Sequence, residues 1–442
     1  MSASTSDSPS PRTRLRPGPF HNRDFRWFFT SRALADTSTE MGAIAVPLLA
    51  ITLLQASPGQ VGVLGVLSTA AFLLIGLPAG IWVDRTRRRS ILVVGNLCHG
   101  LVLLSVPMAW FFGVLTLWQL YACVLLGGVT TVFTRVAQQS YLPLLIDQRD
   151  LVRANAALTS ASSTAGIAGR GAGGYLVQAL GATLVVLCNA FALVSSALAL
   201  LMLRYREPRP ERRPDARLLR DIGHGVRYVV THRLLRPIAM SSVITNLGLN
   251  AIIVMVPVMV VTELGLPEGR VGLFFMVGGV GILAGSLSAQ MIAGWLGHGR
   301  CLWIVGLGVG AGTLAVPLLD TGPLFWVASA GWALSQFGIG VHNVVQISLR
   351  QQITPDHLLG RMTATMRFLL TGSLAISAAW AGTLAEFQGA RAALWVGAGL
   401  CAFCWLPLLL SPLRSMRGVP AHDTEHEEEA DGFRSAEVDD RR

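Results

Sequence analysis

Residues 76–89 read GLPAGIWVDRTRRR, and here an apolar stretch turns abruptly into a charged one. Gly76 and Gly80 are four residues apart, so on a helix they share one face and let a second helix approach closely. The charged group that follows is expected where this helix meets water: Asp84, Arg85, Arg88 and Arg89. We interpret the group as an ion-pair latch that gates the molecule. The alternative is that these arginines only set the orientation of the helix in a membrane.

The composition indicates a chain that is embedded in a lipid bilayer. Of its 442 residues, 52% are hydrophobic and 14% are charged, whereas soluble proteins carry about 25% charged residues. The mean hydropathy is +0.54. We therefore predict an all-α integral membrane protein with about twelve transmembrane helices. The expected spans are residues 28–54, 61–83, 91–112, 116–136, 156–180, 183–203, 238–262, 271–296, 301–319, 323–349, 362–385 and 390–412.

The basic residues, all of which are arginine, predict the orientation of these spans. Five arginines precede the first span and ten lie between Arg204 and Arg236, whereas the loops on the other side hold only Arg270 and Arg391. Because cytoplasmic loops are enriched in basic residues, we expect a multi-pass protein of the bacterial inner membrane with both termini in the cytoplasm. The same distribution accounts for the net charge of +10 without nucleic-acid binding.

The polar segments divide the chain into two halves. Residues 204–237 are the longest polar segment between spans, and their second part has the helical spacing of an amphipathic helix on a membrane surface. The predicted organisation is a disordered cytoplasmic tail at 1–27, an N-terminal six-helix half at 28–203, this linker at 204–237, a C-terminal six-helix half at 238–412 and an acidic cytoplasmic tail at 413–442.

The two halves resemble each other in sequence. A shift of 210 residues places Ser31 on Ser241, Pro47 on Pro257, and Val61-Gly62 on Val271-Gly272. These matches fall at corresponding places in consecutive spans. They predict two pseudo-symmetric six-helix bundles related by an axis along the membrane normal.

The string quoted first resembles the loop signature of the major facilitator superfamily, with Arg87 where that family usually has glycine. The resemblance covers residues 20–412. Four further stretches resemble sequences from the branch of this superfamily that contains macrolide and enterobactin exporters. They are Gln139–Pro143, Arg153–Asn155, Thr354–Asp356 and Gly360-Arg361. This resemblance implies alternating access around a central cavity and the proton-coupled export of a small amphipathic molecule, such as a drug, antibiotic or siderophore.

The first span contains three charged residues on one helix face. Arg32, Asp36 and Glu40 follow each other at four-residue spacing. Because a charge in the hydrocarbon core costs at least about 2.5 kcal/mol on insertion scales, such residues usually face a cavity and carry function. We expect Asp36 and Glu40 to couple transport to protons. The alternative is a structural Arg32–Asp36 ion pair beside a wet vestibule.

The fifth span and the seventh span contain the expected partners of these carboxylates. Arg170 stands where the superfamily's antiporter signature has proline, and it can pair with Asp36 or Glu40 or bind an anionic substrate. The 210-residue shift places Asp36 on Asn246 and Glu40 on Asn250. We therefore expect proton titration in the first half and hydrogen bonds to substrate in the second.

The tenth span adds further polar side chains to the predicted substrate cavity. Its candidates are Gln336, His342, Asn343 and Gln346. His342 could titrate, but a lone histidine inside a membrane is more often a packed, hydrogen-bonded residue. Arg135, one residue before the expected end of the fourth span, is predicted to reach the cytoplasmic surface.

Several function classes are excluded or ranked lower. The chain has no lysine, so it cannot contain the phosphate-binding Gly-x4-Gly-Lys-Ser/Thr loop of an ATPase. We expect no enzymatic activity, cofactor or metal. The expected partners are a small-molecule substrate, protons and the lipid bilayer, and we expect a monomer. A proton symporter that imports a nutrient is the nearest alternative, and a non-transporting membrane sensor or scaffold is the third.

Overall fold

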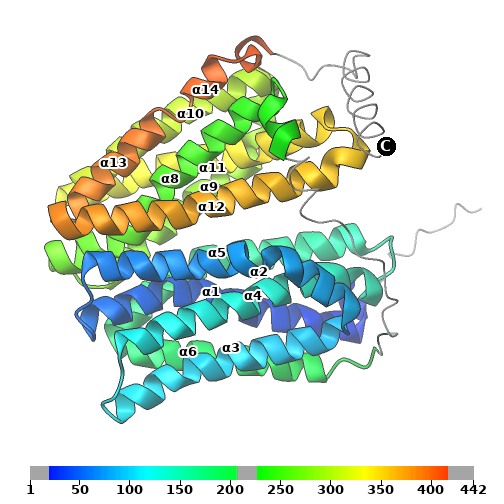
Figure 1. Cartoon of the computed structure of the whole chain (residues 1–442), viewed down its shortest axis with the longest axis vertical. Helices are drawn as coiled ribbons and strands as arrows, with labels where there is room; N and C mark the ends of the chain where they lie inside the picture. The colour runs from blue at the N-terminus through cyan, green and yellow to red at the C-terminus, as the bar shows by residue number, and fades with distance from the viewer. Residues whose placement is uncertain (1–18, 206, 208–225, 417–442) are drawn as a thin grey trace, which may run out of the picture.

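The computed structural model describes residues 19–205, 207 and 226–416, apart from a few side chains named below where they matter. The described chain is helical and contains no strand. Its helices form two bundles that lie side by side, one from the first half of the chain and one from the second (Figure 1).

The first bundle contains six long helices joined by short turns. They are α1 (Arg23–Thr52), α2 (Pro58–Arg85), α3 (Arg88–Phe111), α4 (Leu117–Leu145), α5 (Leu151–Leu180) and α6 (Ala182–Leu201). The Asn22 side chain accepts hydrogen bonds from two backbone N–H groups and so fixes the start of α1. Ser57 and Gln60 form a capping box at the start of α2, with Pro58 in its first turn.

The second bundle repeats this arrangement. Its elements are α8 (Leu235–Val258), which continues as a π-helix (Met259–Glu263), α9 (Gly269–Leu296), α10 (His298–Leu314), α11 (Pro323–Ile353), α12 (Asp356–Gln388), α13 (Ala390–Ala402) and α14 (Leu406–Leu409). Gly181 and Gly389 both have φ of 85°, and they form the one-residue turns from α5 to α6 and from α12 to α13. The repeat seen in the sequence is therefore also present in the turn geometry.

The predicted spans agree with these helices, with differences at some ends. α1 begins at Arg23, inside the segment predicted as a tail, because Asn22 caps it and Phe25 is fully buried. α4 continues nine residues past the predicted end at 136, to Leu145. Of the predicted linker helix, residues 226–231 are helical and 208–225 lie outside the described residues. Residues 1–18 and 417–442 of the predicted tails also lie outside them.

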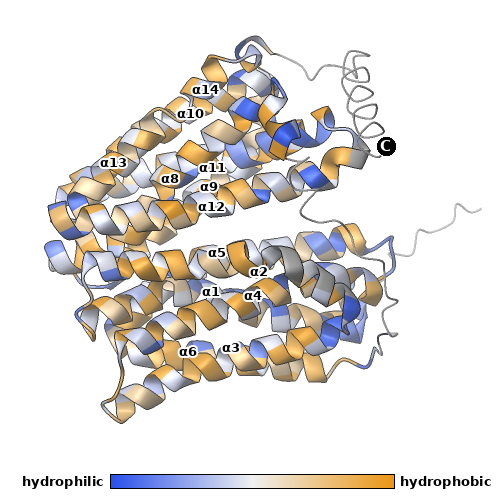
Figure 2. Cartoon of the chain, viewed as in Figure 1, coloured by the Kyte–Doolittle hydropathy of each residue, from blue (hydrophilic) through white to orange (hydrophobic). Residues whose placement is uncertain are grey.

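Within the described residues, eleven helices are long and apolar enough to cross a membrane, and α5 is the long helix outside this set. Figure 2 shows hydrophobic residues along the lengths of the helices and hydrophilic residues gathered at one end of the molecule. We call that end, where α2 meets α3 and α6 ends, the linker end. The opposite end, where α1 meets α2 and α8 leads to α9, is the distal end.

The two bundles are packed together at the distal half by two glycine crossings. A Cβ atom at Gly62 on α2 would lie 2.6 Å from the Cα of Gly382 on α12, and one at Gly174 on α5 would lie 2.6 Å from the Cα of Gly272 on α9. Gly62 and Gly272 are the residues that the sequence repeat aligns. Because lipid offers no hydrophobic drive for helix association, such close packing is the main attraction between helices.

Two hydrogen bonds between the bundles reinforce these crossings. Glu386 of α12 accepts a hydrogen bond of 2.7 Å from the backbone N–H of Gly59 at the start of α2. Gln178 of α5 accepts one of 3.2 Å from the N–H of Gly269 at the start of α9. Each bundle thus satisfies an unpaired N–H group in the first turn of a helix from the other bundle.

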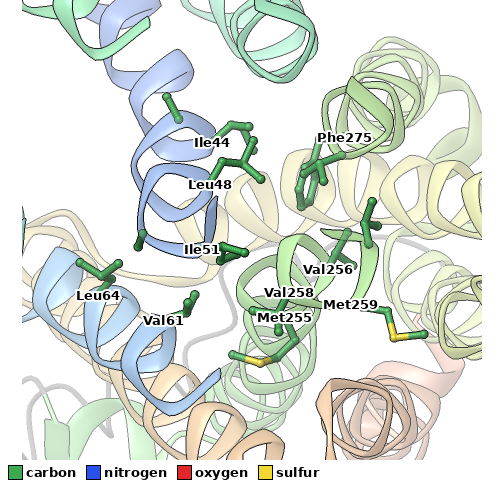
Figure 3. Close-up of a cluster of buried hydrophobic side chains, with 14 of the residues drawn as sticks. Ile44, Leu48, Ile51, Val61, Leu64, Met255, Val256, Val258, Met259 and Phe275 are labelled. Atoms are coloured by element: carbon green, nitrogen blue, oxygen red, sulfur yellow. The ribbon is translucent and has the colours of Figure 1, made fainter. Parts of the chain in front are cut away.

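Apolar side chains close the distal end between these crossings. Figure 3 shows Leu48 and Ile51 of α1 on the side of that helix that faces Val256 of α8 and Phe275 of α9. These residues belong to one buried hydrophobic cluster. The distal end is therefore sealed by packing from both halves of the chain.

We predict that Gly62→Val opens the distal end. The added side chain would meet backbone atoms of Gly382 and Ala378, which cannot move aside without moving α12. The measurement is the reaction of Ser68→Cys, in a background without the native cysteines, with a membrane-impermeant maleimide applied from the distal side. Ser68 lines the central cavity, so its labelling should rise several-fold.

The matched control for this experiment is Gly308→Val on α10, because a Cβ there would meet nothing within 4 Å. It should leave labelling unchanged. Equal labelling in Gly62→Val and the parent protein would contradict the role assigned to the glycine crossing.

Candidate functional site

A cavity of about 540 Å³ lies between the two bundles. It is lined by residues of α1 to α5 from the first bundle and of α8, α9 and α12 from the second. A second cavity of about 740 Å³ is lined by α2, α4, α11 and α12, and shares Phe72 and Arg367 with the first. Its other lining residues, such as Gln351 and Gly360, lie near the linker end. The central cavity therefore leads toward the linker end and is closed at the distal end.

The predicted charged stripe of α1 lies against α5. The Arg32 Nε donates to the Asp36 Oδ2 at 3.0 Å, and the Ser162 hydroxyl of α5 donates to the same oxygen. One turn further along, the Arg170 Nε donates to the Glu40 Oε2 at 2.8 Å. All four charged side chains are partly buried. Both predicted carboxylates are thus paired, and Arg170, which lines the cavity, neutralises Glu40.

Glycine on α5 makes the second of these pairs possible. A Cβ atom at Gly169 would lie 2.9 Å from the Cβ of Glu40, and one at Gly173 would lie 3.4 Å from the Cα of Met41. These two glycines therefore let α1 and α5 approach closely at the level of Glu40.

The second bundle has amide side chains at the corresponding positions. The Asn246 Nδ2 donates to the Leu370 carbonyl at 3.4 Å, and the Asn250 Nδ2 donates to the Leu374 carbonyl at 2.9 Å. These bonds join α8 to α12, just as the Arg170–Glu40 ion pair and the Ser162–Asp36 hydrogen bond join α1 to α5. Asn250 lines the central cavity. Contact of either residue with substrate stays a prediction.

The four candidates on α11 lie elsewhere in this conformation. Among the described residues that line the two cavities, none is Gln336, His342, Asn343 or Gln346. Gln346 is buried and accepts a hydrogen bond of 2.8 Å from the Ser242 hydroxyl of α8. His342 is also buried, whereas Asn343 is exposed and Gln336 is half-buried. Their contact with substrate stays a prediction.

The predicted gate has bonds inside the first bundle. The Arg89 Nε and Nη2 donate to the carbonyls of Leu200 and Leu201 at the end of α6, at 3.1 and 3.0 Å. The Arg88 Nη1 donates to the Glu207 Oε1 at 3.1 Å. Arg85 is exposed. The side chain of Asp84 lies outside the described part, so the proposed latch stays a prediction.

Close helix approach at Gly76 and Gly80, expected from the sequence, is not seen among the described atoms. A Cβ at Gly80 would meet nothing within 4 Å, and one at Gly76 would meet only the ring of Phe72 on the same helix. The expectation was wrong for this conformation, because Gly76 lines the second cavity and this part of α2 packs against α4 through other residues, such as Trp82, whose ring stacks on Phe133.

The structure adds two arginines that sequence analysis did not assign to the site. Arg135 of α4 and Arg367 of α12 both line the central cavity. The expectation that Arg135 reaches the membrane surface was wrong, because α4 continues for roughly 15 Å beyond it. Arg367 lies inside the predicted span 362–385. A charged residue within a span usually faces a cavity, so this position alone could have identified Arg367 as a candidate site residue.

A search for related proteins and structures places this architecture among known ones. Residues 28–379 match the model of the Major Facilitator Superfamily. The enterobactin exporter EntS of Salmonella choleraesuis is 24% identical over 403 residues, which are 90% of this chain and 94% of the relative. EntS of Citrobacter koseri is 23% identical over 399 residues, with coverage of 90% and 94%.

Solved structures have the same fold. A bacterial homologue of the iron transporter ferroportin in an inward-facing state has a TM-score of 0.72 at 16% identity, covering 89% of this chain and 99% of that one. The nucleoside transporter NupG has a TM-score of 0.73 at 10% identity, covering 88% and 99%.

We predict that Glu40 and Arg170 are energetically coupled. Removing one partner alone leaves a charge in a poorly hydrated site, so Glu40→Ala and Arg170→Ala should each lower the melting temperature in detergent. The double variant should lose less stability than the sum of the two, with a coupling of roughly 1 kcal/mol. Additive losses would show that the pair seen here contributes nothing to stability.

Proposed function

The chain belongs to the Major Facilitator Superfamily, and we propose that within this family it exports a small amphipathic molecule in exchange for protons. It is a multi-pass membrane transporter and not an enzyme. The observation that supports the finer proposal is the pair of α1 carboxylates held by arginines beside the central cavity.

Two observations support export as the direction of transport: the function given in the names of the relatives and the distribution of arginines between the two ends of the molecule. The curated relatives are called enterobactin exporters, so export of a comparable amphipathic compound is the natural expectation for this chain. The arginine-rich linker end is proposed to face the cytoplasm. The cavity, which leads toward that end, would then take up substrate from the cytoplasm or inner leaflet.

Proton coupling follows from the chemistry of the two ion pairs. A proton that binds Asp36 or Glu40 cancels the attraction to Arg32 or Arg170 and frees the arginine. Because Arg170 lines the cavity, its release changes the charge that the substrate meets. Protonation and substrate binding are thereby linked, as antiport requires.

The coupling is tested by proton movement in energised inverted membrane vesicles. Addition of a transported antibiotic or siderophore should release protons from vesicles containing the wild-type protein. Asp36→Asn or Glu40→Gln should abolish this release, because an amide cannot take up the proton. The readout is the recovery of a pH-sensitive fluorescent dye.

Asp320→Asn is the matched control, because Asp320, in the turn before α11, forms an ion pair of 3.7 Å with Arg391 at the start of α13, away from the cavity. It should behave like wild type. Substrate-triggered release that survives in both α1 variants would contradict the assignment of the proton carriers. Proton uptake with substrate, in place of release, would indicate symport.

A further inference from the structure

Two arginines on opposite bundles face the central cavity without a carboxylate partner. Arg135 belongs to α4 of the first bundle and Arg367 to α12 of the second. Within the described part of the chain, the ion pairs involve other arginines. The Arg367 guanidinium lies over the Phe72 ring of α2, 4.6 Å from its centroid.

The rest of the cavity wall does not balance these charges. No aspartate or glutamate is among the described residues that line either cavity. Arg170 also lines the wall, but Glu40 neutralises it. The wall is otherwise mainly apolar, with residues such as Ile44, Leu64 and Phe275. The cavity therefore combines an apolar surface with two uncompensated positive charges.

Such an arrangement is costly for the empty protein. Charged side chains inside a membrane are expensive and mark substrate or ion pathways when they face a cavity. Arg135 and Arg367 also repel each other. An anion between them would remove both costs, because it would pair with each guanidinium and replace repulsion by attraction.

We propose that the cavity binds an amphipathic anion, whose carboxylate, phosphate or sulfonate group is held between Arg135 and Arg367. The forked guanidinium groups suit the geometry of these anions, and the apolar body of the ligand occupies the wall of α1, α2 and α9. This assignment rests on the proposed transport function and specifies its substrate class. Phe72 positions Arg367 by stacking beneath it.

The position of the two arginines also gives the anion a mechanical effect. The bundles are already in contact at the distal end, and Arg135 and Arg367 line, from different bundles, the cavity that leads to the linker end. An anion that bridges them draws the two bundles together there. Binding of the correct substrate would then favour closure of the linker end, the first step of alternating access.

The test uses two fluorescent dyes with the same tricyclic frame and opposite charge. Fluorescein is anionic and rhodamine 123 is cationic. Binding to the purified protein in phosphatidylcholine nanodiscs is measured by fluorescence anisotropy. Wild type should prefer fluorescein, and Arg135→Gln and Arg367→Gln should each weaken fluorescein binding at least about tenfold, as loss of a charged hydrogen bond implies.

Arg391→Gln is the matched control, because Arg391 is half-exposed at the distal start of α13, beside Asp320. It should bind fluorescein like wild type. Equal binding of both dyes to wild type, or fluorescein binding that is unchanged in both cavity variants, would overturn the proposal. The wild-type comparison remains decisive even if a variant does not fold.

Two further arms separate this proposal from others. Adding phosphatidylglycerol to the nanodiscs tests the source of the anion. If the lipid competes with fluorescein, the natural ligand is a lipid headgroup. If it does not compete, the natural ligand is a soluble anion. Equilibrium binding needs no proton gradient, so fluorescein selectivity can hold although proton coupling fails. Conversely, proton exchange driven only by cationic substrates would support the proposed function and contradict the anionic site.

Discussion

The cost of a charge inside a lipid bilayer is the constraint on which this structure depends. Every ionised side chain within the twelve-helix bundle must find a partner or face a cavity. Asp36 forms an ion pair with Arg32, and Glu40 forms one with Arg170, where α1 contacts α5. Arg135 and Arg367 face the cavity. The distribution of charge therefore separates a paired region, suited to protons, from an unpaired region, suited to a ligand.

The two halves of the chain use one backbone plan for different chemistry. In the first bundle, α1 is joined to α5 by the Arg170–Glu40 ion pair and by the hydrogen bond from Ser162 to Asp36; in the second, Asn246 and Asn250 of α8 reach backbone carbonyls of α12. The glycine crossings and the distal hydrogen bonds, by contrast, are kept in both halves. The contacts that join the bundles are thus symmetric, while the groups beside the cavity are not. In the proposed mechanism, protonation would act on the first bundle alone.

The sequence was sufficient for the helices and for the local ion pairs. The spans, the repeat and the stripe of Arg32, Asp36 and Glu40 depend on composition and helical periodicity, which act along one segment. The possible pairing of Arg170 with Glu40 also followed, because each is a charge that needs a partner in a membrane.

The remaining parts of the site depend on how separate helices pack. Arg135 was placed at the membrane surface because the apolar pattern weakens after residue 136, although the helix continues to Leu145. Gln346 has the polarity expected of a cavity residue, yet it bonds to Ser242 within its own bundle. Gly80 fits a close helix crossing in sequence, but a Cβ atom there would meet nothing within 4 Å. The sequence of one helix does not determine which of its faces lines the cavity, because that depends on how the other helices pack around it.

The exchange of protons for substrate is tested most directly by uphill uptake into proteoliposomes under an imposed pH gradient. The compound is one that releases protons in vesicles. An acidic lumen should drive its accumulation against its own gradient, in wild type but not in Glu40→Gln, whichever way the protein is inserted. Accumulation driven by an acidic exterior, or uptake that does not respond to either gradient, would contradict proton-coupled antiport by this chain.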